Sequence, residues 1–92
     1  MDFEITEAGY VADYKIKLKF MDGSTGIVDL SNYADKGNVF KAFQDISYFK
    51  KFRVEYGTIV WGSGELDIAP ETLYEKATGK KARYLVQDQK IT

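Results

Sequence analysis

The most constraining feature of this sequence is an alternation of apolar and charged residues that runs from Tyr14 to Phe20. Apolar side chains occupy every second position and lysines lie between them, which is the period of a β-strand with one buried and one solvated face. Asp22-Gly23 follows directly, and Asp-Gly between two strand-like runs is typical of a tight hairpin whose two central positions need positive φ. We therefore predict that Thr25–Leu30 returns antiparallel.

Further short strands and helices are predicted up to residue 79. Pro70 suits the first position of a helix, because the N–H group it lacks would have no partner there, and Gly79 suits the helix end. The other predicted elements are a strand at Phe3–Glu7 ending in a bend at Ala8-Gly9, short helices capped by Asn38 and Asp45, and a hairpin of Phe52–Tyr56 with Thr58–Trp61.

These segments predict an α+β fold with an antiparallel N-terminal three-stranded meander, short helices, a second β-hairpin and a C-terminal helix. A chain of 92 residues suits one domain, which we place at residues 1–79. Residues 80–92 form a basic C-terminal extension with one short apolar patch at Tyr84-Leu85-Val86. We expect a mobile tail, with docking as a short strand as the alternative.

The chain contains neither Cys nor His. Disulfides, thiolate nucleophiles, Ser-His and Cys-His pairs and ordinary zinc sites are therefore excluded. The net charge of −1 argues against a broad basic surface for nucleic acid. No signal-peptide pattern is present, and no apolar stretch approaches the ~20 residues that span a bilayer. We expect a cytoplasmic protein that is not an enzyme, uses no cofactor and has no membrane partner.

A family resemblance depends mainly on Leu66–Tyr74, which reads Leu-Asp-Ile-Ala-Pro-Glu-Thr-Leu-Tyr. Together with Trp61, the strand Phe52-Arg53-Val54 and the phenylalanines at 40, 43 and 49, this segment resembles a family of small bacterial domains of unknown function, over residues 3–78. The resemblance implies an α+β domain of antiparallel strands with a C-terminal helix. Such domains stand alone or are joined to a helix-turn-helix domain, and toxin–antitoxin-like genes often lie beside theirs.

Eight residues are predicted to bind a partner. Two are aromatic residues of the signature region, two lie in the turn between them, and four belong to the basic extension. They are Trp61, Tyr74, Ser63, Glu65, Lys80, Lys81, Arg83 and Tyr84. Each has a structural alternative: Trp61 suits a core position at the end of an apolar strand, and a basic run after a helix is usually solvated.

Other charged residues are interpreted mainly as structural. Asp67 precedes Pro70 by three positions and favours a helix-capping role over a metal ligand. A hard-cation site at Glu65, Asp67 and Glu71 is the less favoured alternative, and no metal is predicted. Lys15, Lys17 and Lys19, spaced about 6–7 Å apart on one strand face, form either a solvated face that discourages edge pairing or a shallow basic groove.

The resulting functional prediction is a non-catalytic protein-interaction domain, antitoxin-like or otherwise inhibitory or regulatory. Its partner is expected to be a small regulatory or toxin-like protein, bound at an exposed sheet edge or at the surface named above. A nucleic-acid-binding accessory protein using the basic C-terminal segment is the first alternative, and a carboxylate metal-dependent enzyme is the second. The sequence leaves a homodimer open.

Overall fold

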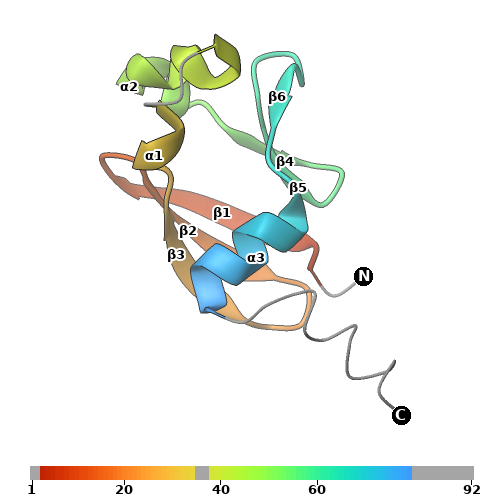
Figure 1. The fold of residues 1–92 in the computed structure, drawn as a ribbon. Coiled ribbons are helices and arrows are strands. Elements are labelled where there is room, and N and C mark those ends of the chain that lie inside the picture. The colour runs from red at the N-terminus through yellow and green to blue at the C-terminus, as the bar shows by residue number, and fades with distance from the viewer. Residues whose placement is uncertain (1–2, 35–37, 80–92) are drawn as a thin grey trace, which may run out of the picture.

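The computed structural model describes residues 3–34 and 38–79, with the side chains of residues 38 and 39 left out. The ten elements follow one another as shown in Figure 1. They are β1 (Ile5–Ala12), β2 (Lys15–Phe20), β3 (Thr25–Asp29), α1 (Ser31–Ala34), the 3-10 helix η1 (Asn38–Gln44), α2 (Ile46–Phe49), β4 (Arg53–Glu55), β5 (Thr58–Trp61), β6 (Leu66–Asp67) and α3 (Pro70–Thr78). The predicted α+β fold class is confirmed.

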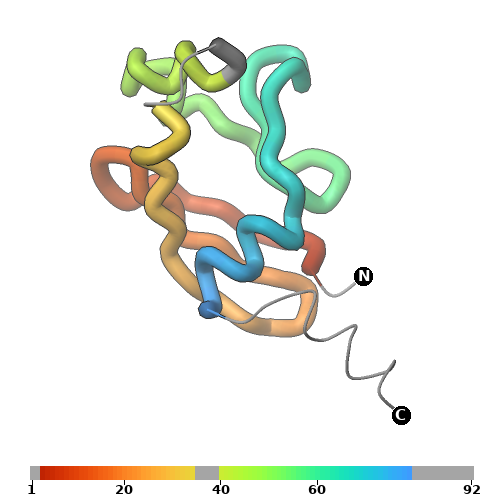
Figure 2. The backbone as a smooth tube through the Cα atoms, in the orientation of Figure 1, coloured from red at the N-terminus to blue at the C-terminus, as the bar shows by residue number. Residues whose placement is uncertain are grey.

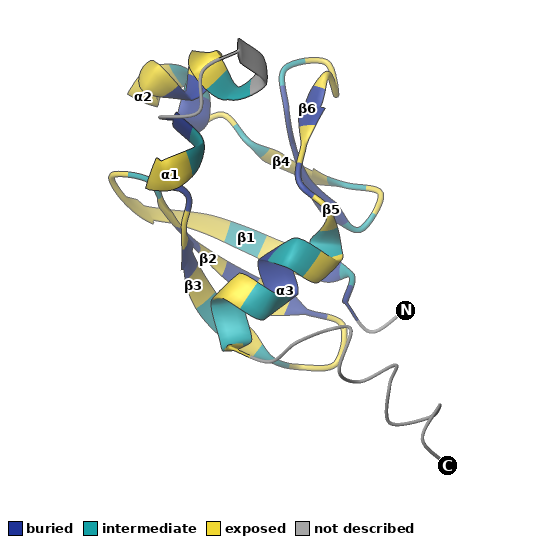
Figure 3. Ribbon diagram, in the orientation of Figure 1, coloured by how far each residue is buried: buried dark blue, intermediate teal, exposed yellow. Residues whose placement is uncertain are grey.

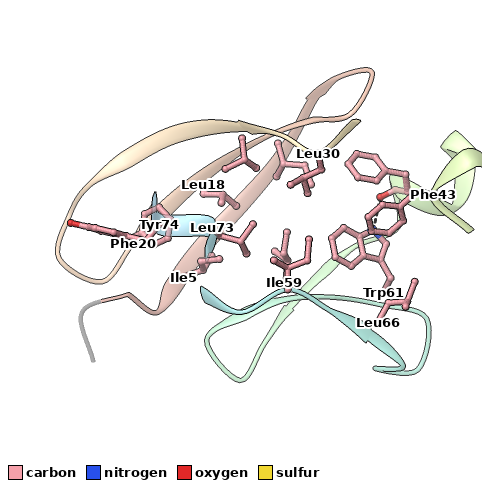
Figure 4. Packing of buried hydrophobic residues seen from close by; sticks show 14 of the residues in the cluster. Ile5, Leu18, Phe20, Leu30, Phe43, Ile59, Trp61, Leu66, Leu73 and Tyr74 are labelled. Carbon is pink, nitrogen blue, oxygen red and sulfur yellow. Dashed lines mark hydrogen bonds between the residues drawn. The ribbon is translucent and has the colours of Figure 1, made fainter. Parts of the chain in front are cut away.

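Two antiparallel sheets enclose the core. The N-terminal sheet has the order β1-β2-β3 and the other has the order β4-β5-β6. The segment before β1 joins them, because Ile5 N–H donates to the carbonyl of Gly57 at 2.9 Å and Met21 N–H donates to the carbonyl of Glu4 at 2.7 Å. The buried side chains of both sheets converge in the space between them (Figure 4).

The alternation in β2 produces the predicted two faces. Ile16, Leu18 and Phe20 are at most 1% exposed, whereas the lysines between them are exposed. Figure 3 shows the strands coloured by how far each residue is buried. Burying an aliphatic or aromatic side chain of this size stabilises a fold by roughly 1.5–3 kcal/mol. The inner face of β2 is therefore a principal part of the core.

The first hairpins differ from their predicted form. Ala8 and Gly9 do not bend the chain, because β1 continues to Ala12 with Gly9 paired to Lys17. The reversal comes at Asp13, whose φ is 49°. The prediction of a bend at Ala8-Gly9 is wrong because a Gly in an extended segment allows a bend without requiring one.

The turn between β2 and β3 also departs from the expected two-residue type. Gly23 has a positive φ of 90°, but Asp22 does not, and Phe20 N–H donates to the carbonyl of Ser24 across three intervening residues. The Asp22 carboxylate instead accepts a 2.8 Å hydrogen bond from Ser24 N–H. This is the three-residue hairpin in which only the last loop residue is left-handed.

A two-residue turn of positive φ does occur between β4 and β5. Tyr56 and Gly57 have φ values of 55° and 77°, and Glu55 pairs directly with Thr58. A left-handed conformation is unusual for a bulky residue, and the side chain of Tyr56 is 97% exposed. The predicted hairpin is confirmed, and its turn has an aromatic residue where Asn is usual.

Helix α3 begins and ends as predicted but is capped differently. Pro70 occupies its first turn, and Gly79 closes it in the left-handed conformation with φ 78°. The N-cap is Ala69, which makes no side-chain capping bond, while Asp67 lies in β6 opposite Val60. The predicted capping role of Asp67 is therefore wrong, because strand pairing with β5 holds it before the helix begins.

Helix α3 packs across β3 (Figure 2). A β-carbon at Gly26 would overlap the backbone carbonyl of Ala77, so this close approach requires glycine. Among the described residues no helix is long and apolar enough to cross a membrane.

Candidate functional site

Trp61 lies wholly inside the core. Its side chain is 0% exposed, and its Nε1–H donates a 2.8 Å hydrogen bond to the carbonyl of Phe49. Its ring centroid is 4.6 Å from that of Phe43 and 5.9 Å from that of Phe49. Figure 4 shows the indole among the buried side chains. Trp61 therefore occupies the core position that the sequence offered as its structural alternative. It does not make the predicted contact with a partner, because no part of the residue reaches the surface.

Tyr74 is likewise buried, at 2% exposure. Its ring packs 5.0 Å from the rings of Phe3 and Phe20, and its hydroxyl donates a 2.9 Å hydrogen bond to Oδ2 of Asp22. The predicted partner contact does not describe Tyr74, because its ring lies in the core. The hydroxyl of Tyr74 thus links α3 to the β2–β3 turn through a hydrogen bond.

Ser63 and Glu65 are exposed in the turn between β5 and β6. The Glu65 carboxylate folds back over this turn, where Oε1 accepts a 2.7 Å hydrogen bond from Ser63 N–H. A β-carbon at Gly62 would overlap the same carboxylate, and the φ of Gly62 is 66°. Glu65 therefore stabilises its own loop, although it remains accessible from solvent.

Tyr48 of α2 approaches the other oxygen of Glu65 at 3.5 Å. Partial burial of the phenol, and then the negative charge of Glu65, raise the pKa of Tyr48. The tyrosine consequently stays protonated and neutral at physiological pH. The Glu65 turn and α2 are thus in contact without an ion pair.

The carboxylates proposed as a cation site do not converge. Throughout residues 3–34 and 38–79, no three carboxylates are grouped in a way that would hold a metal ion. Glu65 is engaged in its turn, Asp67 lies in a strand and Glu71 is in the first turn of α3. The remaining predicted binding residues, Lys80, Lys81, Arg83 and Tyr84, lie outside the described residues.

The lysines of β2 occupy the side of the N-terminal sheet that faces away from the core. Residues paired across an antiparallel sheet share a face, so the register identifies their neighbours. We define the outer lysine face as Glu7, Gly9, Lys15, Lys17, Lys19, Thr25, Ile27 and Asp29. All eight are exposed. β2 is the central strand, so its lysines do not protect a sheet edge, as one interpretation of the sequence had suggested.

Charges on this face are unevenly compensated. Lys15 lies opposite Asp29 and Lys19 lies opposite Glu7, whereas Lys17 lies between Gly9 and Ile27. The pKa of Asp29 is lowered, mainly by hydrogen bonds from the backbone and side chain of Ser31 and to a lesser degree by Lys15. Lys17 is therefore the lysine of the row without an acidic residue directly across from it on either neighbouring strand.

A shallow hollow of about 310 Å³ opens on the outer lysine face, and its lining combines two lysines with one acidic residue. The lining residues are Glu7, Ala8, Gly9, Lys17, Leu18, Lys19 and Thr25. A β-carbon at Gly9 would meet nothing within 4 Å, so the missing side chain leaves open space there. Sequence reasoning proposed a basic groove at these lysines but overlooked Gly9, because it assigned that residue to a bend. A glycine inside a strand can mark the close approach of another molecule.

A protein-family model matches most of this chain. The family model described as "Protein of unknown function (DUF2442)" matches residues 5–79. The searches of curated proteins and of solved structures found no match.

Proposed function

Because the chain belongs to the DUF2442 family, whose description assigns no activity, we propose from its surface that it is a non-catalytic protein-interaction domain. Its outer lysine face binds a partner protein through an acidic, partly apolar segment. The role is regulatory or inhibitory, and the partner is a small regulatory or toxin-like protein in the cytoplasm. The observation that carries this proposal is the position of Lys17 beside an open hollow.

Three properties of the face support protein binding. The described chain leaves it uncovered, so binding requires no rearrangement of the core. Ile27 is 51% exposed beside Lys17 and offers apolar contact area next to the ammonium group. The long stems of Lys17 and Lys19 line the hollow and can pack against a side chain while their charges pair with carboxylates. Protein interfaces combine a buried apolar centre with a polar, solvent-accessible rim, and Ile27 and the lysines would supply these two parts.

Nucleic-acid binding has less support from the same face. Glu7 and Asp29 interrupt the positive charge, so a continuous phosphate backbone would meet repulsion at both ends of the lysine row. The residues of the outer lysine face include no aromatic side chain on which a base could stack. A duplex or single strand that bound with affinity falling steeply with salt would favour this alternative.

A metal-dependent enzyme using Glu65, Asp67 and Glu71 is the third candidate. It requires the carboxylates of Glu65 in the β5–β6 turn, Asp67 in β6 and Glu71 in α3 to meet at one ion. Ligand binding to the folded state raises the melting temperature. An increase in melting temperature in millimolar magnesium, calcium or manganese would therefore revive this candidate.

The test begins with co-purification from the native host and continues with a purified partner. We expect stoichiometric recovery of one protein, whose affinity for the chain is then measured by calorimetry. Lys17→Glu should weaken binding by roughly 10-fold or more, as reversal of an interface charge does. Lys51→Glu is the matched control, because Lys51 is also exposed but lies between α2 and β4, away from the outer lysine face. Failure to recover a partner, or equal losses in both variants, would contradict the proposal.

A further inference from the structure

Within residues 3–34 and 38–79, strand β3 presents backbone groups without a partner along the edge of the N-terminal sheet. Phe20 N–H donates to Ser24 at the turn, and Leu30 N–H donates to Tyr14 at the far end, each at 2.9 Å. Between these bonds the register is regular, so the hydrogen-bonded pairs fall at even-numbered residues. The N–H and C=O groups of the odd-numbered residues point away from β2. These residues are Thr25, Ile27 and Asp29.

The other edges of the described sheets are protected. β1 is irregular at two places, between Ile5 and Glu7 and between Tyr10 and Ala12, and its first N–H is bonded to Gly57. β4 and β6 contain three and two residues, and very short edge strands are themselves a protection against pairing. Bulges and covering segments have the same effect.

Among the residues that the structure describes, none of these protections is found at β3. It is five residues long, follows β2 without a register shift and contains neither Lys nor Pro. Its outward backbone groups meet no partner in the described part of the chain. Ile27, at its centre, is 51% exposed. A regular edge whose only charged side chain is Asp29 at its end, and whose centre is apolar and exposed, is suited to accept another strand.

We propose that β3 pairs antiparallel with β3 of a second copy of this chain, with the two-fold axis at Ile27. This register places Ile27 opposite Ile27 of the second copy and Thr25 opposite Asp29 of the second copy. The outward groups of the odd-numbered residues then form the hydrogen bonds, and the apolar pair is flanked by hydroxyl–carboxylate pairs. No like charges stand directly opposite each other, an arrangement that would destabilise the sheet.

The dimer joins the two N-terminal sheets into one six-stranded sheet. Because the axis is perpendicular to the sheet, the outer lysine faces of both copies lie on the same side. The two α3 helices lie together on the opposite side, since each packs on the inner face of its own β3 at Gly26. Five paired residues bury less area than a stable interface requires, so the dimer should be weak and concentration-dependent.

The test measures the mass of the full chain by sedimentation equilibrium over a wide range of concentrations. We expect the mass to rise from one copy to two copies as the concentration rises. Ile27→Glu should abolish the rise, because two carboxylates would face each other at the axis, while within one copy the new carboxylate lies opposite Lys17. Val54→Glu, an exposed apolar residue of β4, is the matched control and should still dimerise.

A charge-reversal pair makes the test specific for the register. Ile27→Lys alone should be monomeric, whereas an equimolar mixture of Ile27→Lys and Ile27→Glu should recover the dimer, because opposite charges then meet at the axis. Dimers that persist in Ile27→Glu, or a mixture that stays monomeric, would overturn the proposed register.

A chain that is monomeric at every concentration would overturn the dimer itself. Hydrogen exchange of the Thr25, Ile27 and Asp29 amides then identifies the reason, since protected amides indicate that the chain's own C-terminal segment covers the edge. The inference does not depend on the proposed function. A monomer would leave partner binding at the outer lysine face untouched, and a dimer would not by itself support it.

Discussion

The hydroxyl of Tyr74 lies 2.9 Å from Oδ2 of Asp22, although 52 positions separate the two residues in the sequence. The other oxygen of that carboxylate accepts a 2.8 Å hydrogen bond from Ser24 N–H. One aspartate therefore closes the β2–β3 turn and also holds α3. The ring of Tyr74 packs against Phe20 beside this bond, so the contact is partly shielded from water.

Replacing Tyr74 with Phe removes this bond while keeping the ring. We expect the free energy of unfolding to fall by about 0.5–1.5 kcal/mol, the usual net value of one hydrogen bond. Urea denaturation followed by fluorescence measures it. Tyr56→Phe is the control, because the side chain of Tyr56 is 97% exposed, and it should leave stability unchanged. An equal stability of Tyr74→Phe and wild type would show that the bond contributes nothing.

Gly26→Ala tests the close packing of α3 on β3. The new methyl group would overlap the backbone of Ala77, which is not free to move aside as a side-chain end would be. We expect a loss of about 1–3 kcal/mol, as for other overpacked sites. Gly9→Ala provides the comparison, since a β-carbon there meets nothing within 4 Å. If both alanine variants unfold at the same urea concentration, the contact is less tight than described.

Tyr56→Asn should stabilise the protein. The φ of Tyr56 is 55°, and Asn-Gly is the preferred pair for a two-residue hairpin turn of this kind. Relief of part of the left-handed strain should raise stability by about 0.5–1 kcal/mol, less than the full cost of roughly 1–2 kcal/mol for that conformation in ordinary residues. Differential scanning calorimetry should record a higher melting temperature for Tyr56→Asn than for Tyr56→Ala. A lower melting temperature for Tyr56→Asn than for Tyr56→Ala would contradict the proposed strain at residue 56.

Trp61→Phe should be strongly destabilising for a substitution between two aromatic residues. The carbonyl of Phe49 loses the Nε1–H donor, and an unsatisfied buried acceptor costs about 1–3 kcal/mol. The smaller ring also leaves part of the space beside Phe43 unfilled. Phe52→Leu, at the half-buried edge of the cluster, should cost less. Thermal unfolding followed by circular dichroism measures the loss of stability in each variant. A larger loss in Phe52→Leu than in Trp61→Phe would show that the indole contributes less than its contacts indicate.

Asp29 should contribute to the loss of stability in acid. Its pKa is lowered in the folded state, chiefly by the hydrogen bonds from Ser31. Its contribution is therefore fully present above the ordinary carboxyl pKa of about 4 and is lost as the pH falls through the lower, folded-state pKa. Asp29→Asn should be less stable than wild type at neutral pH, with the difference shrinking in strong acid. A difference that stayed constant with pH would exclude this linkage.

Local patterns were enough to predict most elements. The alternation of β2, the left-handed Gly79 and the Asp45 cap, whose carboxylate accepts from Ser47 N–H at 3.0 Å, depend on neighbours within a few positions. These features were predictable because they depend on backbone geometry over one strand or one helical turn.

The sequence predicted the candidate site less well than it predicted the secondary structure. Trp61 and Tyr74 are residue types that suit either a core or an interface, and only the surrounding elements decide between the two roles. Gly9 was assigned to a bend because a glycine does not reveal whether a strand continues through it. The unprotected edge at β3 depends on which strand lies between which, and the register of three strands determines it.

By itself, therefore, the sequence determined the faces of each element, the ends of α3, the α+β class and the family, since all of these follow from short-range order. Only the tertiary structure decided that Trp61 and Tyr74 are enclosed in the core and that Asp67 does not cap helix α3. The physical reason is that burial and edge exposure are set by contacts between residues far apart in the chain, which no local period encodes.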